Sequence, residues 1–134
     1  MSDYAGVIIE RSDHKCLFQL RSKDDDTFPS KWGLFGGHLR KGEKPLIALK
    51  RELLEEYKLK LSSTPNLFFC FSLFFKRFYV FRVNIGRNHP SHKLIDGQKA
   101  SYFFPREMIF KKNTSFPLRL LMAYYFLSKR ICFL

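Results

Sequence analysis

The sequence lacks the features of a secreted or membrane-spanning protein. Its three cysteines, Cys16, Cys70 and Cys132, are scattered and form no C-x-x-C pair, so we expect reduced core cysteines and no disulfide framework. The first residues do not show the basic-then-apolar pattern of a secretory signal. The longest apolar segment, residues 116–127, is interrupted by Arg119 and is shorter than the roughly 20 residues that a bilayer requires. We therefore expect a cytoplasmic protein with no membrane partner.

Acidic residues are also scarce. The chain has 24 Lys and Arg against 12 Asp and Glu, which gives a net charge of +12. Such a charge attracts polyanions, and nucleotides, nucleic acids and anionic membranes all qualify, so charge alone does not choose among them. Internal repeats and low-complexity tracts are absent. A length of 134 residues, 46% of them hydrophobic, predicts one folded domain spanning residues 1–134.

Strands and helices are both expected. Apolar and β-branched runs predict strands at residues 4–10, 16–21, 67–75, 78–83 and 100–104, and longer patterns predict helices at 46–57 and 117–130. The runs at 67–75 and 78–83 are nearly continuous, which is typical of buried strands in a sheet covered on both faces. Strands interspersed with two helices predict an α/β sandwich.

The helix at 46–57 has apolar residues on two flanks. Leu46, Leu49 and Leu53 share one flank, and Ile47 and Leu54 lie on another. We expect both flanks to be packed, which leaves the acidic edge of the helix facing a cleft.

That acidic edge is the most informative feature of the sequence. Glu52, Glu55 and Glu56 occupy relative positions 0, +3 and +4, so the three carboxylates share one helix face. Like charges held this close repel each other, and a hard divalent cation between them relieves the repulsion. A solvated, charged helix face is the alternative interpretation.

The whole segment from Gly37 to Leu59 is G-x₅-E-x₇-R-E-L-L-E-E-Y-K-L. It closely resembles the Nudix box, G-x₅-E-x₇-R-E-U-x-E-E-x-G-U, in which U is a bulky aliphatic residue. The residues in register are Gly37, Glu43, Arg51, Glu52, Leu53, Glu55, Glu56 and Leu59. The departure is Lys58, which stands where the family has a helix-terminating glycine. Lys58 either adopts a left-handed conformation, at a free-energy cost of about 1 kcal/mol, or the helix ends differently.

The resemblance implies an α/β/α sandwich with a mixed sheet, and hydrolysis of a pyrophosphate linkage in a nucleoside diphosphate derivative. It also implies Mg²⁺ as cofactor, with Mn²⁺ as a substitute, held by side chains and one main-chain carbonyl. The implied metal ligands are Glu52, Glu55, Glu56 and the carbonyl group of Gly36. By the same resemblance Glu52 is the favoured general base, although a later loop supplies the base in some members. Glu43 and Arg51 form a supporting pair.

Other candidate residues lie outside the box. Asp96 precedes Gly-Gln in a segment that resembles the MutT-like pattern, which implies a further metal ligand, although the family usually has Glu there. Arg21 aligns with a family position that often contacts substrate phosphate. Tyr4, Phe35 and Phe75 are candidates for stacking on a base, although most aromatic residues in a chain with 16 Phe are expected in the core.

The leading hypothesis is a small-molecule nucleotide substrate. The segment around Asp96 favours MutT-like conversion of a nucleoside triphosphate to a monophosphate and pyrophosphate. A nucleotide sugar, a capped RNA, or a Nudix module that binds a nucleotide or RNA without hydrolysing it are the alternatives. The complete acidic set argues against the non-catalytic module.

Overall fold

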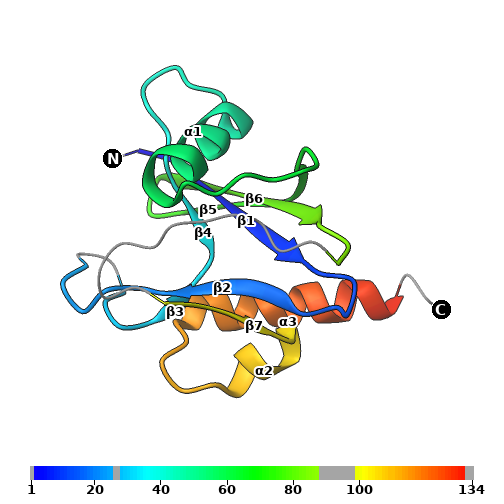
Figure 1. Cartoon of the computed structure of the whole chain (residues 1–134). Helices are drawn as coiled ribbons and strands as arrows, with labels where there is room; N and C mark the ends of the chain where they lie inside the picture. Colours follow the sequence, from blue (N-terminus) through cyan, green and yellow to red (C-terminus); the bar gives the residue numbers. More distant parts are fainter. Residues whose placement is uncertain (1, 26–27, 88–98, 132–134) are drawn as a thin grey trace.

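The computed structural model describes residues 2–25, 28–87 and 99–131, and Asp96 therefore lies outside the described residues. A mixed sheet separates helix α1 from helices α2 and α3, which confirms the predicted α/β sandwich (Figure 1). The strands are β1 Tyr4–Glu10, β2 Cys16–Leu20, β3 Trp32–Gly33, β4 Phe35–His38, β5 Asn66–Leu73, β6 Lys76–Asn84 and β7 Lys99–Phe103. The helices are α1 Pro45–Tyr57, α2 Pro105–Phe110 and α3 Phe116–Ile131.

Strand β1 is the centre of the sheet. The strand order is β3-β2-β1-β6-β5, with β4 paired to β1 and β7 paired to β2. β1 runs parallel to β6, and the other pairs are antiparallel. β4 pairs with the first part of β1, where Tyr4 lies opposite His38, and β2 pairs with its last part, where Ile9 lies opposite Leu17. The start of β1 therefore lies beside the segment that leads into the acidic helix.

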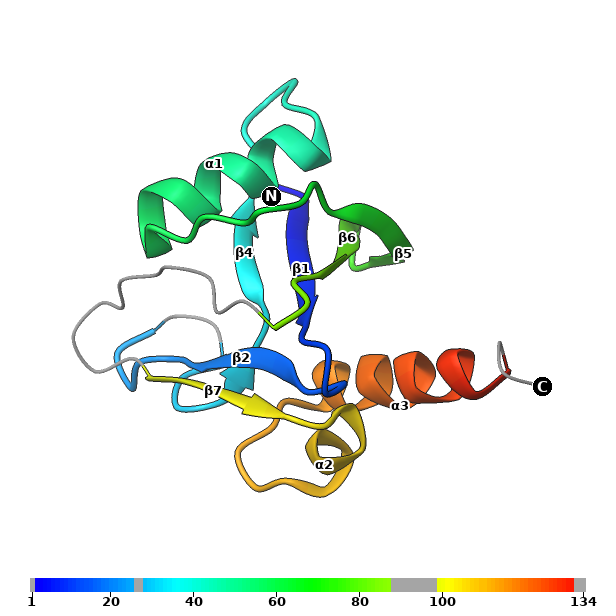
Figure 2. The same cartoon turned by 45° about the vertical axis from the view of Figure 1, so that its right-hand side comes forward.

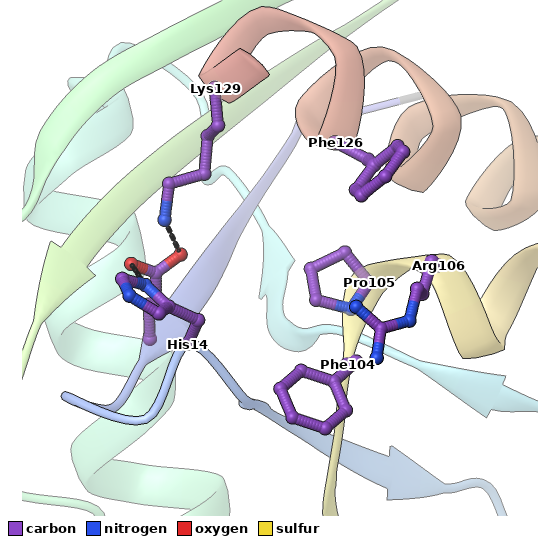
Figure 3. Close-up of a pocket in the computed structure, with 7 residues that line it drawn as sticks. His14, Phe104, Pro105, Arg106, Phe126 and Lys129 are labelled. Atoms are coloured by element: carbon purple, nitrogen blue, oxygen red, sulfur yellow. Dashed lines mark hydrogen bonds and ion pairs between the residues drawn. The ribbon is translucent and has the colours of Figure 1, made fainter. Parts of the chain in front are cut away.

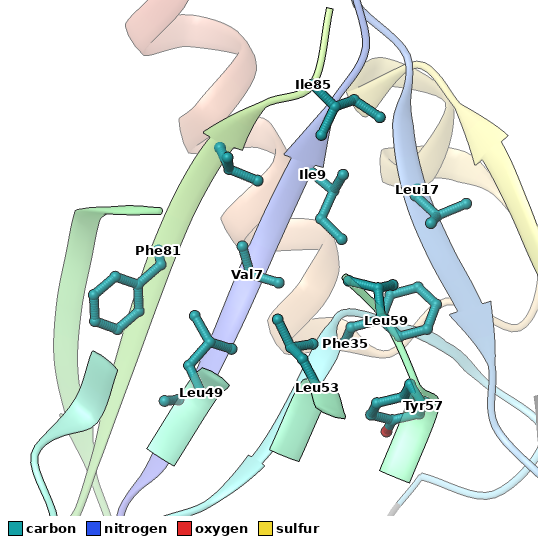
Figure 4. Close-up of a cluster of buried hydrophobic side chains, with 12 residues drawn as sticks. Val7, Ile9, Leu17, Phe35, Leu49, Leu53, Tyr57, Leu59, Phe81 and Ile85 are labelled. Carbon is teal, nitrogen blue, oxygen red and sulfur yellow. The ribbon is translucent and has the colours of Figure 1, made fainter. Parts of the chain in front are cut away.

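Alternating residues of β1 supply two hydrophobic cores. Val7 and Ile9 pack in the cluster beneath α1, together with Leu49 and Leu53 of that helix (Figure 4). Ile8 points to the opposite face, where it joins the cluster formed by α2 and α3. Side chains of a strand point alternately to its two faces, so this one strand anchors helices on both sides.

The two ends of helix α1 are set by Pro45 and Lys58. Pro45 begins the helix, where its missing N–H group is not needed. Lys58 ends it in the left-handed conformation, with φ 49° and ψ 34°. The N–H of Leu59 donates to the carbonyl of Leu53 at 2.9 Å, so a carbonyl of the last turn is satisfied without a glycine.

The expected packing of α1 on two flanks is wrong. Leu49 and Leu53 are buried, but the side chains of Ile47 and Leu54 are 54% and 52% exposed. The sheet covers only one stripe of the helix, and no other described element covers the second stripe.

The prediction that the strand at 67–75 is buried is also wrong. β5 is the edge of the sheet, and its residues are mostly exposed or half-buried, with Leu67 at 56% exposure. Cys70 in this strand is exposed as well, whereas Cys16 is buried as expected. An uninterrupted apolar run does not distinguish a central strand from an edge strand that presents hydrophobic side chains to solvent.

None of the helices in the described part of the chain combines the length and the apolar character needed to cross a membrane.

Candidate active site

The acidic edge of α1 packs directly against the backbone of β4. Gly37 has no side chain, and Glu52 fills the space beside it. A Cβ atom at position 37 would lie 2.4 Å from both Cγ and Cδ of Glu52 and 2.6 Å from its Oε2. Such distances are far below van der Waals contact, so position 37 admits only glycine while Glu52 keeps this place. Gly36 is similarly restricted, because a Cβ atom there would lie 2.2 Å from the carbonyl oxygen of Ala5.

Arg51 links the loop before the helix to the acidic edge. Its Nε donates to Oε2 of Glu43 at 2.8 Å, and its Nη2 donates to Oε1 of the same carboxylate at 2.8 Å. The same Nη2 also donates to the carbonyl of His38 at 3.0 Å. Nη1 donates to Glu52 at 2.9 Å and reaches Glu55 at 3.4 Å. One guanidinium therefore fixes Glu43, β4 and two of the helix carboxylates relative to one another.

The Glu43–Arg51 pair is also favourable electrostatically. The hydrogen bonds from Arg51, supported by the backbone N–H of Arg40, lower the pKa of Glu43 to about 2. The Glu43 carboxylate in turn raises the pKa of Arg51 above its ordinary value. Both groups are therefore fully charged at neutral pH, as a pair that positions a loop requires.

The helix edge offers carboxylate oxygens, which are the ligands preferred by Mg²⁺. Glu52 is half-buried against Gly37, and Glu55 and Glu56 are exposed on the next turn. The donor chemistry therefore fits a hard divalent cation. Within the described residues, no group of three acidic, histidine or cysteine side chains is arranged to hold a metal ion. Arg51 forms ion pairs with Glu52 and Glu55 instead.

A cavity of about 230 Å³ lies beside the end of strand β4, where His38 is located. Tyr4 and His38 form part of its lining, and their rings meet edge to face with centroids 5.5 Å apart. Phe78 lines the cavity from β6, Trp32 from β3 and Leu118 from α3. This lining is apolar and aromatic, which suits a flat aromatic ligand such as a nucleobase.

Basic side chains also line this cavity. Arg21 lines it and pairs with Asp25 at 2.7 Å, and Lys76 lines it from the start of β6. His38 belongs to both parts of the site, since its side chain lines the cavity and its carbonyl accepts from Arg51. The apolar cavity and the acidic helix edge are therefore joined through one residue.

A second cavity, of about 240 Å³, lies at the far end of β1 (Figure 3). Glu10 is 1% exposed there and accepts hydrogen bonds from Lys129 and, at 2.5 Å, from the hydroxyl of Tyr125. Burial alone would raise the pKa of Glu10, but these hydrogen bonds outweigh it and lower the pKa. This buried ion pair ties the last turns of α3 to the central strand.

Comparisons with known proteins give the family of this chain. Residues 2–122 match the family model described as NUDIX domain. The chain belongs to the Nudix family. Members of this family hydrolyse pyrophosphate linkages in nucleoside diphosphate derivatives.

Individual relatives agree with that assignment. The Nudix chain is 38% identical over 55 residues to Nudix hydrolase 3 of Arabidopsis thaliana, a match that covers 40% of this chain and only 7% of that protein. Its fold is similar to a MutT protein from Methanosarcina mazei, with a TM-score of 0.73 and 18% identity over 96% of this chain and 94% of that one. A MutT Nudix hydrolase from Burkholderia pseudomallei gives a TM-score of 0.71 and 19% identity over 91% and 95% of the two chains.

Most residues predicted from the Nudix box lie together. The structure brings Glu43, Arg51, Glu52 and Glu55 into one hydrogen-bonded group against β4, and Glu56 lies on the same edge of the helix. Arg21 lines the neighbouring cavity. The three aromatic residues predicted as candidates for stacking on a base lie in different places. Tyr4 lines the cavity, Phe35 is fully buried in the core, and Phe75 is fully exposed.

The rest of the cavity lining could not be predicted from the sequence. Trp32, Phe78 and Leu118 come from three distant parts of the chain and share no motif. Trp32 is the one tryptophan of the sequence, which is a weak signal. His38 ends strand β4, and its backbone carbonyl accepts a hydrogen bond from Arg51.

Proposed function

We propose that this Nudix enzyme hydrolyses a nucleoside triphosphate, releasing a monophosphate and pyrophosphate. The observation that supports the proposal most directly is the position of His38. Its side chain lines the aromatic cavity, and its carbonyl accepts a hydrogen bond from Arg51. An aromatic cavity with Arg21 and Lys76 in its lining adjoins an acidic helix edge that Arg51 holds in place. A nucleotide has the matching parts, an aromatic base and a chain of phosphates. The natural substrate in this proposal is a small molecule of the cytoplasmic nucleotide pool.

The proposed roles follow the positions of the side chains. Glu52, Glu55, Glu56 and the carbonyl of Gly36 would hold Mg²⁺, or Mn²⁺ in its place, and Asp96 is a further candidate outside the described residues. When bound, the metal neutralises phosphate charge and lowers the pKa of the attacking water.

In the proposed reaction Glu52 takes the proton of the attacking water. Its contact with Gly37 and its hydrogen bond with Arg51 fix the direction of its carboxylate, and such positioning is a large part of enzymatic rate enhancement. Arg51 and Glu43 are positioning residues. Arg21 would contact a phosphate, and for this its guanidinium would have to exchange Asp25 for the substrate.

The aromatic lining of the cavity would hold the base. Tyr4 and Phe78 are neighbours on adjacent strands, with ring centroids 6.1 Å apart, and Phe78 stacks on Phe71 at 4.9 Å with an angle of 8° between the rings. These rings are held by the sheet itself, so little ordering is required when a base binds.

The test is turnover of a nucleotide panel with Mg²⁺ or Mn²⁺, in which phosphate, pyrophosphate and monophosphate release are followed. Glu52→Gln and Glu55→Gln should each lose at least 100-fold in kcat. Glu107→Gln on α2 is the matched control, because it makes the same change at an exposed glutamate outside the site. Absence of turnover for every nucleotide, or full activity of both site variants, would overturn the proposal. Salt-dependent RNA binding without turnover would instead support the non-catalytic module.

A further inference from the structure

The two longest uncharged segments of this basic chain are residues 61–75 and 120–128. Neither contains Asp, Glu, Lys or Arg, although the chain has a net charge of +12. The first segment includes the whole of β5, and the second is the central part of α3. Uncharged stretches are expected in buried elements, so an uncharged element at the surface requires another explanation.

The structure places these two segments side by side at the surface. The ring of Tyr124 on α3 lies 5.7 Å from the ring of Phe68 and 4.9 Å from the ring of Phe69 on β5, between centroids. β5 is the outermost strand on its side of the sheet (Figure 2). The exposed apolar residues of α3 recur at helical spacing and share one face, and they are Phe116, Leu120, Tyr124 and Leu127.

Strand β5 is open to pairing along its outer edge. An edge strand presents unpaired backbone N–H and C=O groups, and charged residues or proline usually prevent it from pairing with another chain. β5 has neither, and its register is irregular only between Leu67 and Phe69. From Phe69 to Leu73 it is a regular strand, and its outer edge faces no other strand within the described residues.

The charge of the chain indicates which partner fits this surface. A net charge of +12 makes two copies repel each other, so they approach with least repulsion at an uncharged face. An acidic partner would select the basic faces instead, and an anionic membrane attracts apolar surfaces that also carry Lys and Arg. Homodimer interfaces have apolar cores depleted of charge and enriched in aromatic residues, as this surface is.

The size of the surface is also sufficient for a stable dimer. Leu73, the turn residues Phe74 and Phe75, and the four exposed residues of α3 are each between 45% and fully exposed. Since a fully exposed residue of this size presents roughly 200 Å², they offer on the order of 800 Å² together. A stable protein–protein interface buries about 800 Å² of each partner.

We propose that the protein forms a symmetric homodimer through β5, its turn to β6 and the exposed face of α3. The β5 strands of the two copies pair antiparallel across a two-fold axis, and the α3 faces pack beside them. An antiparallel pair of identical strands satisfies such an axis, because each copy presents the same residues to the other. Helix α1 lies on the other side of the sheet, so the dimer does not depend on the proposed function.

The test is the mass of the protein by sedimentation equilibrium, from about 1 to about 100 μM, with a reducing agent and without nucleotide. We expect a dimer whose Kd falls as NaCl is raised, because salt screens the repulsion between the two copies. Leu120→Lys and Cys70→Lys should each raise Kd at least about 100-fold, since a symmetric interface carries every substitution twice. Both residues are exposed, so urea unfolding should show both variants folded.

Leu54→Lys on α1 is the matched control, because it makes the same change at a residue that is 52% exposed, against 57% for Leu120. It should leave Kd unchanged. A monomer over the whole concentration range, or a dimer that persists in Leu120→Lys or in Cys70→Lys, would overturn the proposal. Dissociation by Leu54→Lys would also overturn it and assign the contact to α1. A monomer that sediments with phosphatidylcholine vesicles, unless Leu120 is replaced, would assign the surface to a lipid instead.

Discussion

Substitution of Gly37 by alanine should separate catalysis from stability. A Cβ atom at this position would lie 2.4 Å from two carbon atoms of Glu52. Ordinary carbon–carbon contacts are about 3.5 Å, so the carboxylate has to move by roughly 1 Å. Glu52 is at the edge of a helix and half-buried, so its side chain has room to turn outward while the helix stays in place.

The expected magnitude follows from that displacement. A misplacement of about 1 Å in a catalytic group lowers the rate on the order of 100-fold, which corresponds to about 2.7 kcal/mol of transition-state stabilisation. The free energy of unfolding should change by less than about 1 kcal/mol. Alanine lowers the conformational entropy of the unfolded chain, and this offsets part of the destabilisation caused by the local strain.

The assay measures kcat and KM for the best nucleotide of the panel, together with urea unfolding of the same preparations. Gly86→Ala is the control with the opposite pattern. A Cβ atom there meets nothing within 4 Å, but its φ is +63°, so this variant should lose about 1 kcal/mol of stability and keep its turnover. If Gly37→Ala retains more than a third of wild-type kcat, the contact with Glu52 does not position a catalytic group.

Three further substitutions test other parts of the structure. Lys58→Gly should raise the free energy of unfolding by about 0.5 kcal/mol, because it relieves the left-handed lysine, and it should leave kcat unchanged; a large loss of turnover would give Lys58 a catalytic role. Arg51→Lys should lower kcat or the apparent Mg²⁺ affinity about 10- to 100-fold, since an ammonium group cannot reproduce the five contacts. Arg106→Lys, on an exposed side chain of α2, is the control and should change neither. Lys129→Met should lower the free energy of unfolding by roughly 3 kcal/mol at pH 7, because it leaves Glu10 buried without its main partner.

The effect of pH on the last variant has a defined sign. The folded pKa of Glu10 is lowered, so its stabilising contribution is present above the unfolded value of 4.5 and is lost as pH falls through the folded pKa. The stability difference between Lys129→Met and the wild-type protein should therefore shrink in urea titrations below pH 4.5. A difference that stays constant down to pH 2 would show that the loss comes from packing alone.

Much of the site could be predicted because its parts are close together in the sequence. The spacing of the glutamates on α1 follows from the helical repeat, and the pair formed by Glu43 and Arg51 is enclosed in one short segment. The glycine at 37 was also informative, and the structure supplies its physical reason in the contact with Glu52.

The features that could not be predicted depend on which elements pack against each other, and a single sequence does not contain this information. The apolar run of β5 predicts burial, but the strand order makes it an edge. Ile47 and Leu54 continue the apolar pattern of α1 onto a face that nothing in the described residues covers. No helix is predicted at residues 105–110, because a helix of six residues is too short to show an apolar repeat in the sequence.

Strand β1 makes the two ends of this molecule interdependent. Tyr4 at its start lines the aromatic cavity, and Glu10 at its end holds Lys129 of α3. The first turns of the same helix supply Leu118 to the cavity wall. The cavity is thus bounded by a strand and a helix that are joined at the opposite end by this ion pair. The buried ion pair at one end of the strand therefore helps to hold together the strand and the helix that form the cavity wall at the other end.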